Sequence, residues 1–553
     1  MLRSGAPLRR AALLWAGPLA FLALFYAWPM AGIVAASFGR EADGLLRALT
    51  APATGRVVLF TLGQAAASTA LTLLVGLPGA WLVARYRFAG KTLFRALTAI
   101  PFVLPTLVVA AAFDALLGSR GWINAALESA GMPPLRFTRT LGAILVAHVF
   151  YNTSIVLRLV GDYWSRIDRR LWDAARTLGA GAAQRWLRVS LPLLAAPVAA
   201  AAVLVFIFCF TSFGVILILG GPRFATIEVE IYYQAISLFD LPVAASLSLV
   251  QIAITLALGI AYTRLMRRVT RPLPLRAPRE NERSLRGSRA RAVAASVLLG
   301  IAFFQLAPLA ALATRSVSGA EGPTLAFYRQ LGVESRQGAF HGSALTAVRN
   351  SLAFAAAATV IALAVGTPAA WALGRHGAAR SSRLFDPLLM LPLGTSAVTL
   401  GLGFIVALNR PPLDLRASPL LIPIAHALVA LPFVVRSLAP ALATVEPRLI
   451  QAARVLGAAR AQVARRVELP IVARAMGVAA AFAFSISLGE FGATAIVARG
   501  DLPTIPLAIF RLLGRPGALN LGQALALATI LMLVTAVVVT AIERLRVARV
   551  SSF

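Results

Sequence analysis

A stretch of 26 residues occurs twice in this chain, and this duplication limits the possible folds more than any other feature. The copies run from Ile167 to Pro192 and from Val445 to Pro470, align without a gap and match at 14 of 26 positions. Each has the frame acid or amide, Ala-Ala, three residues, Gly, nine residues, Val-x-Leu-Pro. The spacing of 278 residues predicts a chain built from two similar halves.

The similarity extends well beyond the repeated stretches. Upstream, a Gly-x-Pro-x-x-Trp pattern begins at Gly76 and again at Gly366, 290 residues later. Downstream, Thr226-Ile227 recurs at Thr504-Ile505, again with the spacing of 278. We therefore divide the chain into a first half (1–266), an arginine-rich linker (267–290) and a second half (291–553).

The composition excludes a soluble globular protein. Hydrophobic residues make up 59% of the chain, charged residues only 13%, and the mean hydropathy is +0.80. Apolar runs of about 20 residues, long enough to cross a bilayer as a helix, recur along the chain. We predict an all-α integral membrane protein with about 12 transmembrane helices in two parallel six-helix repeats. The spans begin near Ala11, Val57, Leu97, Leu141, Ala195, Ala244, Ala292, Ser351, Phe385, Pro419, Ala475 and Leu521.

The basic residues are concentrated in alternate loops. The net charge of +32 could indicate nucleic-acid binding, but the arginines cluster after spans two, four and six. The loop after span five instead holds Glu228, Glu230 and Asp240. This is the positive-inside bias, so we expect both termini and both repeated stretches in the cytoplasm, and no nucleic-acid partner. The apolar run after the basic N-terminus is too long for a signal peptide and indicates a retained first span.

The repeated stretch has the features of a docking surface. Ala174, Ala175, Leu178 and Gly179 form a small apolar ridge that another protein can approach closely, and the glycine permits a turn between two short helices. Leu191-Pro192 then starts the next span, because proline is tolerated at a helix start. An ordinary amphipathic loop is the alternative, but a mere connection does not need this spacing twice.

The frame resembles the EAA motif of membrane subunits of type I binding-protein-dependent ABC importers. That resemblance implies the type I importer permease fold, with each stretch seated as a coupling helix in a groove of a cytoplasmic ATPase subunit. The chain departs from the motif in the second copy, where an amide, Gln451, stands in place of the acidic residue. The implied coupling residues are Asp173, Ala174, Ala175, Gly179, Leu191, Pro192, Gln451, Ala452, Ala453, Gly457, Leu469 and Pro470.

The chain is not expected to hydrolyse ATP itself. Its only lysine, Lys91, lies in Gly90-Lys91-Thr92, but Arg85 occupies the position where a P-loop needs its first glycine. ATP and magnesium would therefore be bound by two copies of a partner ATPase, and a periplasmic or lipid-anchored binding protein would deliver the solute. The single cysteine, Cys209, excludes a disulfide framework. We expect no catalytic residue, cofactor or metal in this chain, which would lie in a bacterial inner membrane with several spans.

Polar residues within the spans are the candidates for the substrate pathway, because such residues usually face a bundle interior. His148 and His426 are equivalent, so a structural role near the axis between the halves is the alternative. Glu490 near the end of span eleven could contact a passing cation or could bond nearby amides. Asp114 is a further embedded acid. The full candidate set is His148, Thr211, Ser212, His426, Ser487 and Glu490.

The fused layout resembles the thiamine and ferric-iron permeases among these importers. The stretches 118–122, 145–152, 220–232 and 487–492 favour the thiamine group, although iron and polyamine permeases carry similar stretches. The resemblance therefore implies a permease for thiamine or its phosphates, with ferric iron and polyamines as alternatives. A secondary transporter also fits twelve spans, but it leaves the repeated stretches unexplained. A membrane enzyme would need a nucleophile–base pair or metal-ligand spacing.

Overall fold

The computed structural model describes residues 5–38, 50–269, 281–285, 287–319, 322–333, 343–376, 380–409, 411 and 413–547. Eleven helices in these ranges are long and apolar enough to cross a membrane, or twelve if one bent pair forms a span. This confirms the prediction of an all-α membrane protein with about twelve spans. The extreme termini and residues 270–280, which are much of the predicted linker, lie outside the described residues.

The first half contains six spans with short helices between them, and three of the spans include a π-helical turn (η). The elements are α1 (Gly5–Leu22), η1 (Ala23–Ala27), α2 (Trp28–Phe38), α4 (Pro52–Arg85), β1 (Tyr86–Arg87), α5 (Lys91–Leu97), α6 (Ile100–Val103), α7 (Thr106–Leu117), α8 (Trp122–Ser129), α9 (Leu141–Ile155), η2 (Val156–Val160), α10 (Gly161–Arg166), α11 (Arg170–Thr177), α12 (Ala182–Arg185), η3 (Trp186–Ser190), α13 (Leu191–Phe210), α14 (Gly214–Leu219), η4 (Pro222–Phe224, 3-10), α15 (Ile227–Tyr232), η5 (Tyr233–Ser237) and α16 (Leu241–Val269).

The second half repeats this order from α18 onward. Its elements, preceded by β2 (Arg283–Ser284), are α18 (Ser288–Arg315), β3 (Ser318–Gly319), β4 (Gly322–Pro323), α19 (Ala326–Arg329), η6 (Gln330–Gly332, 3-10), α20 (Ala344–His376), α21 (Arg380–Gly394), α22 (Ala397–Ala407), α23 (Leu421–Ala443), α24 (Pro447–Val455), α25 (Arg460–Val463), η7 (Ala464–Glu468), α26 (Leu469–Gly489), α27 (Gly492–Val497), α28 (Ile505–Leu513) and α29 (Ala518–Val547).

The span predicted from Phe385 is not a straight helix. Helices α21 and α22 meet there at 99°. The break has a local cause: Ser396 starts the new helix, because its side-chain oxygen accepts a hydrogen bond from the Thr399 amide at 3.0 Å. The span predicted from Leu97 is likewise divided, into α5, α6 and α7, with Pro101 in the first turn of α6 and Pro105 just before α7.

Equivalent residues make equivalent contacts in the cores of the two halves. Helices α4, α9 and α13 pack together in the first half, as α20, α23 and α26 do in the second. A Cβ added to Gly76 would lie 2.7 Å from Val156, and one added to Gly366 would lie 2.7 Å from Val434. Both glycines therefore permit the close approach of two spans. The contacts agree with the duplication seen in the sequence.

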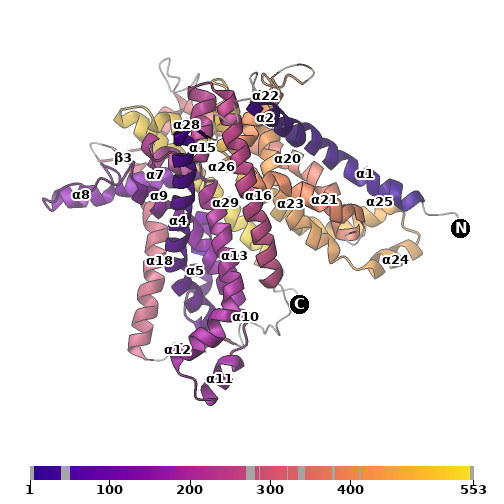
Figure 1. Cartoon of the computed structure of the whole chain (residues 1–553), viewed down its shortest axis with the longest axis horizontal. Coiled ribbons are helices and arrows are strands. Elements are labelled where there is room, and N and C mark those ends of the chain that lie inside the picture. The colour runs from indigo at the N-terminus through magenta and orange to yellow at the C-terminus, as the bar shows by residue number, and fades with distance from the viewer. Residues whose placement is uncertain are drawn as a thin grey trace.

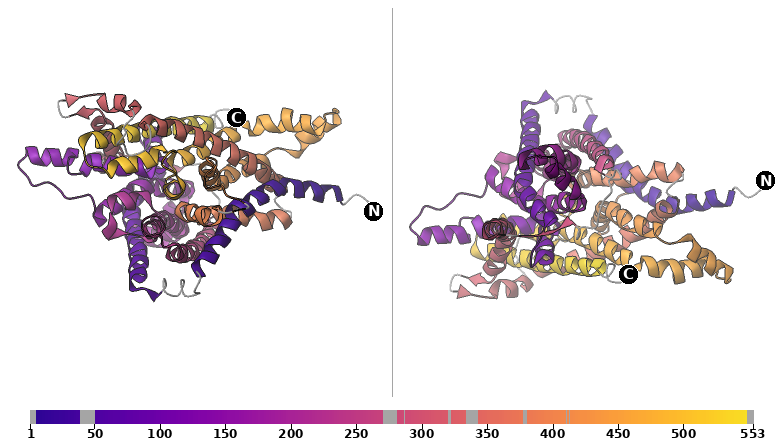
Figure 2. Two further views of the ribbon diagram at one scale, coloured as in Figure 1. Left: turned by 90° about the horizontal axis from the view of Figure 1, so that it is seen from above. Right: turned by 90° about the horizontal axis from the view of Figure 1, so that it is seen from below.

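The first helix of each half packs against the other half. In both views of Figure 2, indigo α1 lies beside the orange helices of the second half. The Trp15 and Phe385 rings lie 5.0 Å apart, and the Tyr26 hydroxyl lies 2.7 Å from the Thr395 hydroxyl. Helix α18 packs in turn on α7 and α4 of the first half. The halves are thus interlocked as well as adjacent.

The two repeated stretches both lie on the side of the molecule away from the place where the halves meet. They are far from each other on that side (Figure 1). Figure 1 shows α11 and α12 at the bottom and α24 and α25 at the right, whereas the helices of the two halves meet near the top. We call the side that carries both stretches the basic end, and the other side the opposite end. The halves therefore converge at the opposite end and spread apart toward the basic end.

The described part of the linker docks on the first half. Arg283–Ser284 (β2) pairs in parallel with Tyr86–Arg87 (β1), and Glu282 forms ion pairs with Arg87 at 3.1 Å and Lys91 at 2.8 Å. Asn281 is buried, and its side-chain amide donates to the Ser165 carbonyl at 3.0 Å. This part of the linker is a structured brace beside the first repeated stretch.

Candidate functional site

Both repeated stretches fold into the same helix–turn–helix. The Gly179 amide donates to the Arg176 carbonyl at 3.0 Å, and the Gly457 amide donates to the Arg454 carbonyl at 3.0 Å. Both glycines have φ +82, a left-handed conformation that ends a helix and disfavours residues with a side chain. A Cβ at either position would meet nothing within 4 Å. The glycines are therefore needed for the turn, not for close packing within this chain.

The second short helix of each stretch begins with the same hydrogen bond. The Gln184 side-chain oxygen accepts from the Gly181 amide at 3.2 Å. The Gln462 side-chain oxygen accepts from the Ala459 amide at 2.9 Å. These glutamines were missed as candidates, although both copies carry one at the same place, five residues after the turn glycine. They fix the direction of the helix after the turn.

A leucine at the tip of each stretch is almost fully exposed. Leu178 is 87% exposed and Leu456 is 86% exposed, and each directly precedes the turn glycine. In both copies the first Ala of the Ala-Ala pair (Ala174, Ala452) is exposed and the second (Ala175, Ala453) is half-buried. Both leucines therefore gain almost no burial from contacts within their own chain.

The two acid-or-amide positions have different surroundings. Asp173 forms ion pairs with Arg169 and with Arg283 of the linker, each at 3.2 Å. Its counterpart Gln451 is exposed. After each turn, Leu191-Pro192 and Leu469-Pro470 begin α13 and α26 with proline in the first turn, as predicted. The two stretches share a backbone conformation but differ at this position. Asp173 of the first stretch forms ion pairs, whereas Gln451 of the second is uncharged.

The candidate histidines lie inside their own halves. His148 is buried and its Nδ1 lies 2.9 Å from the Ser68 hydroxyl of α4. His426 is also buried, with Nδ1 2.8 Å from the Ser487 hydroxyl and Nε2 2.8 Å from the Thr494 hydroxyl. These bonds join neighbouring helices within one half. The structure therefore brings His426 and Ser487 together, but it does not bring the two histidines to a shared site.

Glu490 joins the second of these clusters. Its carboxylate lies 3.2 Å from His426 Nε2 and accepts hydrogen bonds from the Ala493 and Thr494 amides at 2.9 and 3.1 Å. Its counterpart Ser212 is buried, and the neighbouring Thr211 hydroxyl donates to the Ile207 carbonyl at 2.9 Å. The carboxylate is thus held by the start of α27 and by a histidine.

An aromatic stack joins the two halves beside these residues. Phe213 and Phe491 follow the ends of α13 and α26, and their rings stack with centroids 5.3 Å apart and planes at 22°. Tyr232 packs on Phe213 at 5.4 Å, and its counterpart Phe510 packs on Phe491 at 5.4 Å. All four rings come from equivalent positions, so the stack lies at the junction of the halves. The Ser/Glu-Phe-Gly motif is visible in the sequence, but it does not reveal this role of the phenylalanines.

Glu228 does not lie in an exposed loop as the sequence suggested. It is 1% exposed in α15. Its carboxylate accepts hydrogen bonds from Gln251 Nε2 at 2.5 Å and from the Ser396 hydroxyl of the second half at 2.9 Å. Its apolar neighbours Ile227, Val229 and Ile231 are fully buried as well. These apolar residues around the acids are the sequence signal that could have indicated burial.

Two interlocked halves of membrane-spanning helices, each with an exposed helix–turn–helix at one end, define a duplicated transport permease. The chain belongs to the family of binding-protein-dependent permeases. The protein-family model described as binding-protein-dependent transport system inner membrane component matches residues 76–271. The thiamine transport system permease protein ThiP of Brucella abortus (strain 2308) is 30% identical over 95% of this chain and 96% of its own.

One further relative has the same description, and one solved structure is also similar. The ThiP protein of Escherichia coli (strain K12) is 28% identical over 88% of both chains. A chain in the crystal structure of a bacterial alginate ABC transporter, in complex with a periplasmic protein bound to an alginate pentasaccharide, aligns with 49% of this chain and 99% of its own. That alignment has 18% identity and a TM-score of 0.42. The family model and the helices long enough to cross a membrane identify the chain as a multi-pass inner-membrane transport subunit.

Proposed function

We propose that the chain is the permease of an ATP-driven importer that carries thiamine or its phosphates. The observation that carries this proposal is the pair of exposed helix–turn–helix units, with identical turns at Gly179 and Gly457. Two matching docking surfaces at one end of a permease fit two copies of one ATPase. Because the basic loops lie at that end, it faces the cytoplasm together with both termini.

The coupling role falls to the residues that shape and expose these units. The glycines set the turn, and the leucines before them, with the alanines Ala174 and Ala452, would contact the ATPase groove. Movement of the two ATPase subunits would then change the separation of the basic ends of the two halves. A solute-binding protein would dock at the opposite end, where the halves converge. We also propose that the chain consists of two halves, 1–266 and 291–553, joined by the linker 267–290.

The pathway runs between the halves, at the aromatic stack of Phe213 and Phe491. Thiamine is an aromatic cation, and aromatic rings attract both flat apolar groups and positive charge. Glu228 in α15 and Glu490 between α26 and α27 place buried carboxylates in the elements around this junction. The rings are buried, so the pathway is shut at this level in the present conformation. Names of relatives that match nearly the whole chain support thiamine over ferric iron or polyamines.

Purification from native membranes tests this proposal. We expect a cytoplasmic ATPase to be recovered at two copies per chain, and a binding protein that carries thiamine. Proteoliposomes of the complex should then take up labelled thiamine only with ATP. Uptake of ferric iron or a polyamine in its place would overturn the substrate. Uptake driven by an ion gradient without ATP would overturn the importer mechanism and favour a secondary transporter.

A further inference from the structure

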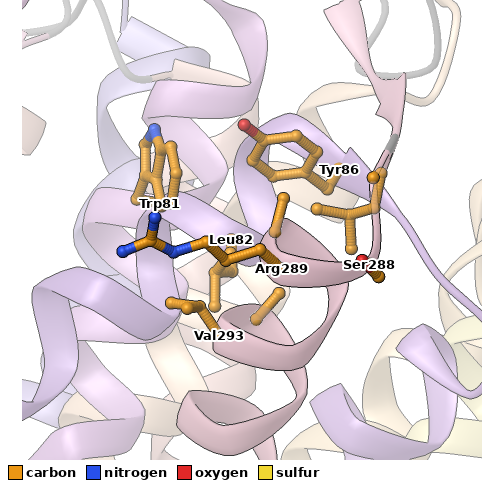
Figure 3. A pocket seen from close by; sticks show the side chains of 10 residues that line it. Trp81, Leu82, Tyr86, Ser288, Arg289 and Val293 are labelled. Atoms are coloured by element: carbon orange, nitrogen blue, oxygen red, sulfur yellow. The ribbon is translucent and has the colours of Figure 1, made fainter.

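A cavity opens between the two halves at the basic end of α4 and α18. It has a volume of about 570 Å³, within the range of about 300 to 1,000 Å³ typical of small-molecule sites. Figure 3 shows Trp81 and Tyr86 on one side and Arg289 and Val293 on the other. None of the described residues that line this cavity belongs to the exposed turns or to the aromatic stack, and the transport mechanism proposed above does not use it.

The lining combines aromatic, apolar and cationic groups. The Trp81 and Tyr86 rings meet edge to face at 5.2 Å, and Trp81 is still 40% exposed. Arg289 is exposed and is the one charged residue among the described residues that line the cavity. The nearby acid Glu282 is bonded to Arg87 and Lys91 instead. Within the described part of the chain the cavity therefore offers an exposed guanidinium beside amphipathic rings, the combination found at membrane interfaces.

A second, almost wholly apolar groove continues along the same two helices. It has a volume of about 460 Å³ and is lined from α4 by Leu71 and Val75 and from α18 by Val297, Gly300 and Phe304, among others. Along α18 the walls run from Val293 in the first cavity to Phe304 in the groove, about 16 Å at 1.5 Å per residue. One hydrocarbon leaflet is about 15 Å thick. The two hollows together span one leaflet.

We propose that the cavity and the groove form a binding site for one anionic phospholipid of the leaflet at the basic end. The phosphate would lie at Arg289, the glycerol region against Trp81, and an acyl chain along the groove past Gly300. A guanidinium recognises phosphate well because it can donate two parallel hydrogen bonds. The inference needs the chain to lie in a membrane, but it depends on neither the substrate nor the direction of transport.

Such a lipid would join elements of both halves. Helix α4 belongs to the first half and α18 to the second, and a Cβ on Gly79 would already lie 2.6 Å from the end of the Ile301 side chain. The residues Leu285 and Gly287 close the cavity next to the start of α18. A bound lipid would therefore hold together the contact between the halves just where the linker enters the second half.

Native mass spectrometry of the full chain in mild detergent tests this site. The probes are phosphatidylglycerol, phosphatidylcholine with the same acyl chains, and glycerol phosphate, which has the charge without the chains. We expect one phosphatidylglycerol to be retained, phosphatidylcholine to be retained less, and glycerol phosphate not to compete. Saturation by glycerol phosphate would show a site for free phosphate esters and would overturn the lipid site.

Two variants locate the lipid. Arg289→Gln should weaken retention of phosphatidylglycerol about tenfold, the loss expected for one charge-assisted contact. Gly300→Leu should fill the groove, since an added Cβ there meets no protein atom within 4 Å. The matched controls are Arg264→Gln, an exposed arginine of α16, and Gly63→Leu, a glycine of α4 with similar space. All four variants should elute as folded monomers, and equal retention by all four would overturn the proposal.

Discussion

Phe213 and Phe491 are equivalent residues of the two halves, and their rings stack on one another with centroids 5.3 Å apart. Equivalent residues that touch must lie on the axis that relates the halves. Each ring is also packed by its own equivalent neighbour, Tyr232 or Phe510. Any movement that separates the halves at this level must therefore break the stack.

Replacing either ring by alanine should favour the separated arrangement of the halves. An aromatic pair contributes about 0.5 to 1.5 kcal/mol beyond its burial, so F213A and F491A should each shift the equilibrium several-fold. We expect the ATPase rate of the assembled complex, measured without binding protein, to rise several-fold. The control is Phe206→Ala, which removes a stacked pair inside α13 alone. A role for the stack at the axis would be contradicted if the ATPase rate also rose in the control. It would equally be contradicted if the rate rose in neither F213A nor F491A.

The hydrogen bond between Glu228 and Ser396 should stabilise the contact of the halves. The bond is buried, and Ser396 also starts α22, so S396A should lower the free energy of unfolding by about 1 to 3 kcal/mol. A double-mutant cycle with E228A separates the two effects, because of the two roles of Ser396 only the inter-half bond needs the Glu228 carboxylate. Thermal unfolding of the purified chain measures the free energy of unfolding of each variant. Additive losses would mean that the inter-half bond contributes nothing.

Substitution of the turn glycines should weaken binding of the ATPase. Alanine at Gly179 or Gly457 must adopt φ +82, which costs about 1 kcal/mol or more without any clash. We expect less ATPase to co-purify with G179A and least with the double variant, while membrane insertion is unchanged. Gly181→Ala is the control, since Gly181 has φ −64 and its counterpart in the second copy is Ala459. Equal recovery from all variants would remove the coupling role of the turns.

Repetition and periodicity in the sequence predicted the two halves and their spans. Spacings of 278 and 290 residues indicated the duplication, and the apolar runs indicated the membrane-spanning helices, because both signals are local in the chain. The turn at Gly179 was also predictable, since a left-handed helix end favours glycine. The coupling role of these stretches stays a prediction until an ATPase is bound.

Contacts between distant segments could not be read from the sequence. The burial of Glu228 depends on Ser396, 168 residues away, and only the fold brings them together. Similarly, the right-angle break before α22 interrupts an apolar run that gives no sign of bending beyond its proline and serine. The packing of α1 and α18 on the opposite halves has no local signature either, because one apolar surface can pack on many partners.

The linker residue Asn281 should hold the first repeated stretch in place. Its side chain donates to the Ser165 carbonyl of α10 at 3.0 Å and accepts from the amide of Arg169, the residue directly before α11, at 3.3 Å. Loss of these buried bonds in N281A should cost about 1 to 3 kcal/mol, mostly as local opening. We therefore expect faster hydrogen exchange at the amides of α11 and unchanged exchange at α24, which has no such brace from the described part of the linker. Asn520→Ala, which removes an exposed local bond to the Pro516 carbonyl, is the control. Equal exchange at α11 in both variants would show that the linker only connects the halves.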